Sequence, residues 1–210
     1  MTTVEEAKEA ATTTEDEVTE APRAKPGRST AWWGMAVLIM TEATIFASLL
    51  SSYFFLQAAA HEWPLGGIEA PELQKVSLMS IVLIGSSVPM FWAEHGIRKG
   101  QVWRLKAGLI MVILMGFSFF CFLTLYEYPE LTFGIKDNAY ASIFYLTTAF
   151  HGAHVLGGLL MLCVVLVKAF QGKLSAERHI TVEVVGMYWH FVDVVWIFVF
   201  SSLYLSAHLK

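Results

Sequence analysis

The chain has 210 residues, a formal net charge of −4, a hydrophobic fraction of 56% and a mean hydropathy of +0.55. This composition is too apolar for an ordinary soluble domain and indicates membrane-spanning segments. No basic patch points to a nucleic-acid partner. Cys121 and Cys163 both lie within apolar runs, which favours free buried cysteines over a disulfide or a metal site.

Residues 1–28 differ in composition from the remainder of the chain. They are rich in Thr, Glu and Ala and poor in large apolar residues, so they cannot bury enough surface to fold alone. They also lack the apolar core of a cleaved secretory signal. We predict a disordered, acidic cytoplasmic tail at 1–28 and one membrane domain at 29–210.

Five later stretches are long and apolar enough to cross a membrane, because a helical span needs about 20 such residues. They cover approximately residues 32–57, 76–94, 105–126, 140–167 and 183–207. Lone strands cannot satisfy their backbone in lipid, so the sequence predicts an all-α, polytopic five-transmembrane-helix bundle. Pro89 is expected to kink the second helix.

The distribution of basic residues predicts the orientation of the bundle. With the N-terminus inside, the inner segments hold Arg23, Lys25, Arg28, Arg98, Lys99, Arg104, Lys106, Lys168, Lys173 and Arg178. The outer segments then hold only Lys75, Lys136 and Lys210. Because basic residues are enriched in cytoplasmic loops, we predict an N-terminus inside and a C-terminus outside.

Three polar side chains on three predicted helices lie at similar depth. Counting from the inner ends at 1.5 Å per residue, Glu42 and Asp193 are about 15 Å deep and His154 about 20 Å. An acid at the centre of a span costs roughly 2.5–3.5 kcal/mol on insertion scales. We therefore expect these groups to face a neighbouring helix, a cavity or a lipid head group.

Helical spacing places further polar residues on the same helix faces as Asp193 and His154. Glu183, His190 and Asp193 share one face of the last helix, and His151 and His154 share one face of the helix before it. This pattern predicts that the fourth and fifth helices turn polar faces toward each other or toward a shared groove.

Three functions compete for these residues. A metal or haem site would use the histidines, but only three lie within the spans. A proton or ion carrier would use the acids, although full transporters more often have more spans and inverted repeats. A structural network of interhelical hydrogen bonds needs no further ligands or helices, so it is preferred. A phospholipid bound beside this network is left open.

Three tryptophans are candidates for lipid or subunit contacts. Trp33 lies near a span end, where an interfacial belt of aromatic residues is usual. Trp189 and Trp196 are seven residues apart on one face of the last helix, a spacing typical of packing on a partner helix.

Several segments, in order, resemble subunit III of the haem-copper terminal oxidases. FYLTTAFHGAHVLGGLLML at 144–162 and WHFVDVVW at 189–196 are similar to two hallmarks of that family, and WGMAVLIMTEATIF at 33–46 to the segment carrying its intramembrane glutamate. FWAEHGIRKG at 91–100 and LYEYPELTFGIKDNAYASIFY at 125–145 fit as well. The resemblance covers about residues 30–208.

The resemblance implies a subunit without redox centres of its own. Haem and copper would sit in partner subunits I and II, which transfer electrons to oxygen and pump protons. This chain would pack against subunit I, support its proton uptake and protect it from inactivation during turnover, with subunit II and a small subunit IV as further partners. The carbodiimide-reactive glutamate of the family corresponds to Glu42. The family's polar positions correspond to His151, His154, Glu183, His190 and Asp193.

One departure from the family is visible. The long form has seven helices, and its first two are missing here, as in the short bacterial form. The lipid cleft that those two helices help to form would need another subunit to complete it. The resemblance implies a bacterial inner (plasma) membrane and oxidation of cytochrome c. A quinol oxidase, a subunit associated with nitric oxide reductase and an independent proton or ion carrier stay open as alternatives.

Overall fold

The computed structural model describes residues 27–68 and 71–208. Nearly all of the predicted tail at 1–28 lies outside these residues, so its disorder stays a prediction. Within the described residues every secondary-structure element is helical. The predicted all-α class is therefore confirmed.

The bundle is built from helices that exceed the predicted spans by a few residues at each end. The elements are α2 (Thr30–Ala59), η1 (Leu65–Gly67), α3 (Leu73–Gly85), α4 (Ser87–Arg98), α5 (Val102–Phe122), η2 (Leu123–Glu127), α6 (Tyr128–Glu130), α7 (Ala139–Phe170), α8 (Ile180–Val199), η3 (Phe200–Leu205) and η4 (Ser206–His208). Together they form five helices long and apolar enough to cross a membrane, as predicted: Thr30–Ala59, Leu73–Arg98, Val102–Glu130, Ala139–Phe170 and Ile180–His208.

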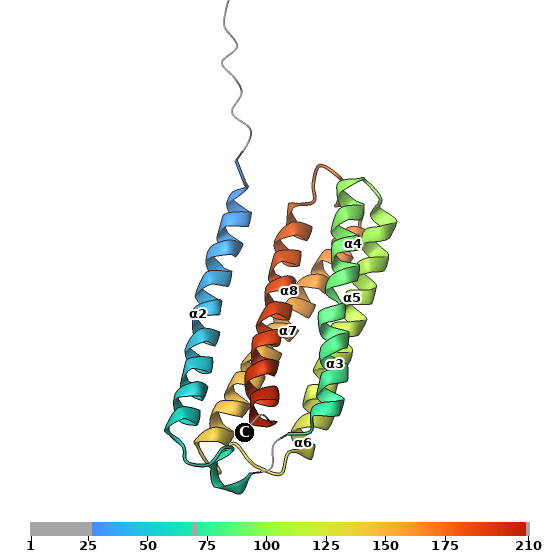
Figure 1. Ribbon diagram of the computed structural model, residues 1–210. Coiled ribbons are helices and arrows are strands. Elements are labelled where there is room, and N and C mark those ends of the chain that lie inside the picture. The colour runs from blue at the N-terminus through green and yellow to red at the C-terminus, as the bar shows by residue number, and fades with distance from the viewer. Residues whose placement is uncertain (1–26, 69–70, 209–210) are drawn as a thin grey trace, which may run out of the picture.

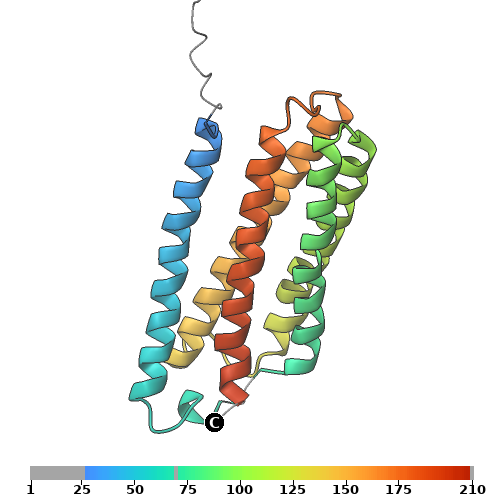
Figure 2. The same ribbon diagram turned by 45° about the horizontal axis from the view of Figure 1, so that its top comes forward.

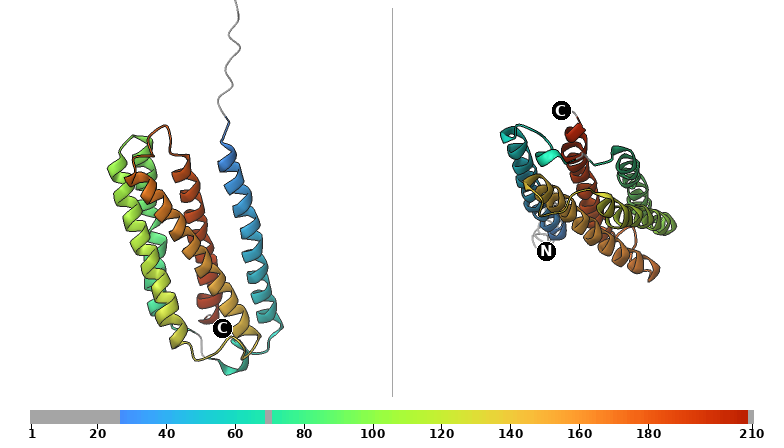
Figure 3. Two further views of the ribbon diagram at one scale, coloured as in Figure 1. Left: turned by 180° about the vertical axis from the view of Figure 1, so that it is seen from behind. Right: turned by 90° about the horizontal axis from the view of Figure 1, so that it is seen from below.

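Helix α8 lies in the middle of the bundle. It contacts α2 on one side, α7 behind it, and α3 and α4 on the other side (Figures 1 and 2). Helix α5 packs against α3, α4 and α7, whereas α2 contacts α7 and α8 (Figure 3). Because α8 is surrounded by neighbours, its polar residues must satisfy one another or reach adjacent helices.

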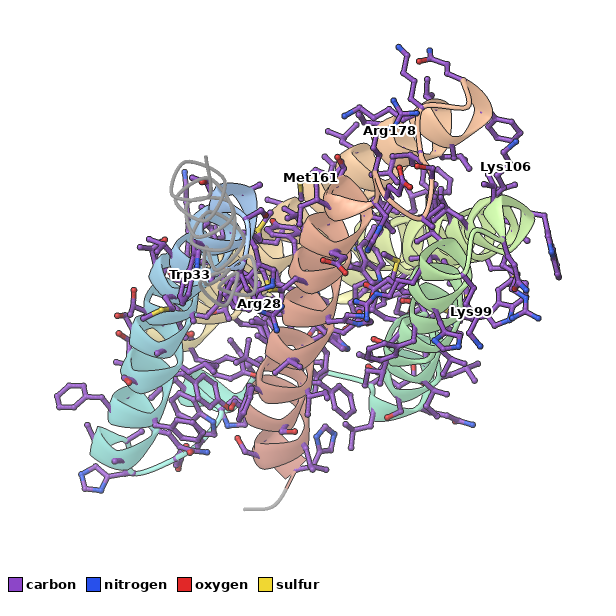
Figure 4. All side chains as sticks on the ribbon, turned by 90° about the horizontal axis from the view of Figure 1, so that it is seen from above. Arg28, Trp33, Lys99, Lys106, Met161 and Arg178 are labelled. Carbon is purple, nitrogen blue, oxygen red and sulfur yellow. The ribbon has the colours of Figure 1, made fainter. Side chains whose placement is uncertain are left out.

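The first described helix begins and the last one ends at opposite ends of the bundle (Figure 1). Arg28, Lys99, Lys106 and Arg178 gather at the end where α2 begins, which we call the cationic end (Figure 4). The opposite end is called the distal end. The assignment of the cationic end to the cytoplasm stays a prediction from loop charge.

The second span is interrupted at Ser86, between α3 and α4. Pro89 explains the interruption, because a proline ring lacks an amide proton and clashes with the carbonyl four residues earlier, that of Gly85. Gly108 of α5 packs closely against this region: a Cβ at Gly108 would lie 2.7 Å from the Pro89 carbonyl oxygen. The break thus turns Ser86 into a hydrogen-bonding position inside the bundle.

The distal end contains two π-helical segments that the sequence did not predict. They are η2 at the end of α5 and η3 at the end of α8. Loops are tied to the same end: the Tyr53 hydroxyl accepts from Trp63 Nε1 at 3.1 Å, and Asn138 Nδ2 donates to the Leu65 carbonyl at 2.8 Å. π-Helical turns occur often at functional sites, so this end is a candidate for binding.

Candidate functional site: polar clusters within the spans

The first polar cluster joins α2 to α7. His154 Nε2 lies 3.2 Å from Glu42 Oε2, and both side chains are largely buried. The His154 ring packs beside Phe46 and Phe150, with centroid distances of 5.1 and 4.8 Å. The similar depth that the sequence predicted for Glu42 and His154 is therefore realised as a direct contact between two helices.

The hydrogen bonds of His154 show which of its ring nitrogens carries a proton. His154 Nδ1 lies 2.7 Å from the Phe150 carbonyl, and a carbonyl only accepts, so Nδ1 carries a proton. A hydrogen bond between His154 Nε2 and Glu42 Oε2 then requires a proton on one of these two atoms. The pair can therefore exist as imidazolium and carboxylate or as two neutral groups, without rearrangement of the helices.

The second polar cluster joins α8 to α4. The Ser87 hydroxyl donates to Asp193 Oδ2 at 2.5 Å and lies 3.0 Å from His190 Nδ1. A hydroxyl has one proton, so Ser87 accepts from a protonated His190 Nδ1. His190 Nε2 faces Glu94 Oε1 at 3.7 Å, and the ring is stacked on Phe91 at 4.0 Å. Ser87 thus links Asp193 to His190, and His190 in turn faces Glu94.

Glu183 belongs to a third group at the cationic end. Its Oε1 lies 3.0 Å from Arg98 Nη2 and 3.3 Å from His179 Nε2. Glu183 is in the first turn of α8, where a negative charge also favours the helix dipole. It therefore ties the start of α8 to the end of α4 and does not contact Asp193.

His151 is the most enclosed of the predicted residues. Its exposed fraction is 0%, and neither ring nitrogen has a hydrogen-bond partner among the described residues. Its ring lies against Trp196 at 4.7 Å and approaches Phe119 and Phe46 edge-on. The structure thus separates His151 from His154, although the two lie on neighbouring turns of α7.

Trp189 and Trp196 anchor the centre of the bundle. Both are fully buried, and each indole Nε1 donates at 2.8 Å to a serine of the second span, Trp189 to Ser86 and Trp196 to Ser80. The predicted packing on a partner helix is thus what the structure has. Of the three tryptophans proposed for lipid or subunit contact, only Trp33 presents its ring at the surface, with an exposed fraction of 58%.

Within the described residues, the polar side chains of the fourth and fifth helices do not contact each other, although such a contact was one of the two arrangements predicted from helical spacing. Helix α7 directs His154 toward Glu42 on α2, whereas α8 directs His190 and Asp193 toward α4. Between α7 and α8, the Trp189 ring instead packs on Gly158, where a Cβ would lie 2.9 Å from it. The polar residues of these helices therefore form two separate clusters, one between α2 and α7 and the other between α4 and α8.

Sequence reasoning missed Ser80, Ser86, Ser87 and Glu94, all of which lie in the second span. A signal for them existed, because serines and an acid within an apolar run need partners. The sequence predicts that the second span ends at Glu94, yet α4 continues to Arg98. Glu94 packs against Gly186, where any Cβ would collide with its carboxylate.

We predict that Ser87→Ala destabilises the bundle by about 1–3 kcal/mol, because Asp193 would lose its hydroxyl donor inside the protein. Denaturant titration in mixed micelles, followed by circular dichroism, would measure this loss. Ser118→Ala is the matched control, since the Ser118 hydroxyl is exposed and only bonds its own helix at Leu114. Equal stability of the two variants would contradict the role of Ser87.

Over residues 27–68 and 71–208, no group of three or more His, Cys, Asp or Glu side chains is placed to hold a metal ion. The histidines instead have separate surroundings: His154 meets Glu42, His190 meets Ser87, and His151 is enclosed by aromatic rings. The arrangement can hold protons and fix helices relative to one another.

Comparisons with known proteins point to one family. A family model described as cytochrome c oxidase subunit III matches residues 17–208. Cytochrome c oxidase subunit 3 of Drosophila yakuba is 35% identical over 178 residues, which cover 82% of this chain and 68% of that protein. The same protein of Locusta migratoria is 35% identical, with 82% and 67% covered, and that of Oncorhynchus mykiss 36% identical, with 82% and 68% covered. The chain therefore belongs to the cytochrome c oxidase subunit III family.

Proposed function

We propose that this chain is a non-catalytic integral subunit of a respiratory terminal oxidase, which stabilises subunit I and supports proton uptake into it. Haem and copper would sit in subunits I and II, with cytochrome c as the electron donor. A small subunit IV is a further proposed partner. The proposed location is a bacterial inner (plasma) membrane.

The observation that carries this proposal is the pairing of polar side chains between helices of the same chain. Glu42 meets His154, Asp193 meets Ser87, and Glu183 meets Arg98. These contacts do not converge on one cavity, as the groups of a catalytic centre would. They fix the relative positions of α2, α4, α7 and α8, which suits a subunit that offers a rigid surface to its neighbour.

The Glu42–His154 pair supports the proposed part in proton uptake. In this pair an imidazole nitrogen and a carboxylate oxygen face each other at 3.2 Å within the spans. A proton can pass between the two groups with little movement, because His154 Nδ1 stays bonded to the Phe150 carbonyl in either state. A neighbouring subunit that consumes protons would benefit from this local reserve during sustained turnover.

We expect Glu42→Gln to preserve assembly and haem content and to shorten the lifetime of the oxidase during turnover. The glutamine amide can still donate to His154 Nε2, so the helices stay joined, but it cannot exchange a proton. Oxygen consumption recorded over many turnovers would give both the initial rate and the inactivation rate.

Glu62→Gln is the control, because Glu62 is an exposed acid in the loop after α2. It should leave the inactivation rate unchanged. If Glu42→Gln inactivates no faster than the wild type, the charge of Glu42 has no part in sustained turnover. If the haem spectrum is lost while the complex stays assembled, the proposed division of roles among the subunits fails.

A further inference from the structure

A pocket at the distal end of the bundle has no part in the function proposed above. It is a cavity of about 540 Å³ between the start of α3 and the end of α5, lined by Glu72, Lys75, Glu127, Glu130, Leu131 and Phe133 among others. The start of α3 and the end of α5 lie across the bundle from α2 (Figure 1). Three carboxylates and one ammonium group line the pocket, so its charge favours a cationic ligand.

Glu127 is the residue that makes this pocket unusual. Its exposed fraction is only 5%, and the buried Tyr204 hydroxyl is its neighbour, yet neither that hydroxyl nor Glu127 Oε1 has a well-formed hydrogen bond among the described residues. The carboxylate is placed there by the π-helical segment η2, which ends at Glu127. A buried carboxylate oxygen without a donor costs free energy, and a ligand that donates hydrogen bonds would recover it.

The other charges stand at the mouth of the pocket. Lys75 Nζ lies 2.8 Å from Glu130 Oε2 and 3.1 Å from Glu72 Oε2, and all three side chains are about half exposed. Lys75 therefore has a fixed position beside the carboxylates and can also reach an anion at the rim. The pocket thus presents an acidic interior and a cationic group at its edge.

An apolar groove continues from this mouth along α3. It shares Glu72 and Lys75 with the pocket and runs past Leu78 and Ile81, which have exposed fractions of 59% and 68%. Helix α3 begins here and the span formed by α5 and η2 ends here. The ends of membrane-spanning helices lie at the level of lipid head groups. A polar pocket that opens onto an apolar groove at this level matches an amphiphile.

We propose that this pocket binds the head group of an amine-bearing zwitterionic phospholipid such as phosphatidylethanolamine. Its ammonium group donates to Glu127 and Glu130, its phosphate lies near Lys75, and an acyl chain follows Leu78 and Ile81. A primary ammonium has three donors, which suits two carboxylates better than a quaternary ammonium without any. A bare metal ion fits less well, because no metal-holding group was found within residues 27–68 and 71–208.

The test uses the full chain, purified from its own membranes with whatever subunits accompany it, so it does not depend on the oxidase function. After delipidation, dioleoyl-phosphatidylethanolamine, dioleoyl-phosphatidylcholine or dioleoyl-phosphatidylglycerol is added, and native mass spectrometry counts the lipids retained. We expect retention of phosphatidylethanolamine in preference to the other two. Glu127→Gln and the milder Glu130→Gln should each weaken it about tenfold, because each removes a charge-assisted hydrogen bond.

Glu177→Gln is the control, since Glu177 is an exposed acid near the cationic end, far from the pocket. Glu130→Gln keeps the test valid if Glu127→Gln does not fold, because the Glu130 side chain is half exposed. Equal retention of all three lipids, or equal retention by wild type and both variants, would overturn the proposal. Carbodiimide cross-linking of Glu127 or Glu130 to a lysine of another subunit would also overturn it, by showing that a protein fills the pocket.

Discussion

Replacing Trp189 by alanine is expected to destabilise the chain by about 3–5 kcal/mol, the largest loss among the variants considered. The indole is fully buried, and its removal would leave a cavity at the contact of α5, α7 and α8. It would also leave the Ser86 hydroxyl without the indole donor. Denaturant titration in mixed micelles would measure the change.

Trp33→Ala is the matched control for this experiment. The same atoms are deleted, but the Trp33 ring is more than half exposed at the start of α2. Its loss should change the free energy of unfolding by no more than about 0.5 kcal/mol. If the two variants lost similar stability, the indole of Trp189 would not be a central packing element.

Gly116→Ala tests the same contact by addition instead of deletion. A Cβ at Gly116 would lie 2.5 Å from Cη2 and 2.9 Å from Cζ2 of Trp189, and 3.1 Å from Leu159 Cδ2. The indole cannot move away, because its Nε1 is bonded to Ser86 and its other face meets Gly158. We expect a loss of about 1–3 kcal/mol from overpacking, measured by the same titration.

Gly152→Ala is the control, because Gly152 is also a buried glycine within a helix. Its added Cβ would be 3.5 Å from Leu123 Cδ2, an ordinary contact, and alanine is a better helix former than glycine. This variant should be neutral or more stable. In the double variant, Trp189→Phe should recover part of the loss at Gly116→Ala; strict additivity would contradict a direct clash between the two positions.

The spans could be predicted from the sequence because lipid imposes a simple requirement on length and apolarity. Counting along the helices predicted that Glu42, His154 and Asp193 lie at similar depth, but not which of them meet. In the structure Glu42 contacts His154, whereas Asp193 contacts Ser87. Helical spacing shows which residues share a face of α8, but it does not show that this face is turned to α4.

The cluster around Asp193 could not be predicted from the sequence for a further reason. Its central residue, Ser87, follows the break at Ser86, which depends on Pro89 and on the close approach of Gly108. The π-helical segment η2, which places Glu127 in its pocket, was likewise not predicted from the sequence. The sequence therefore predicted the helices and the polar residues within the spans. Which side chains these residues contact could be seen only in the packed structure.

We propose above all that this chain is bound to a haem-containing oxidase and does not itself carry the redox centres. The most direct measurement is purification of the affinity-tagged chain from its own membranes in mild detergent, followed by selective removal of the chain from the complex. We predict co-purification with haem-containing subunits, a haem spectrum and initial oxygen consumption that survive removal of the chain, and faster inactivation afterwards. A chain that purifies alone, or takes the haem with it when removed, would contradict the account.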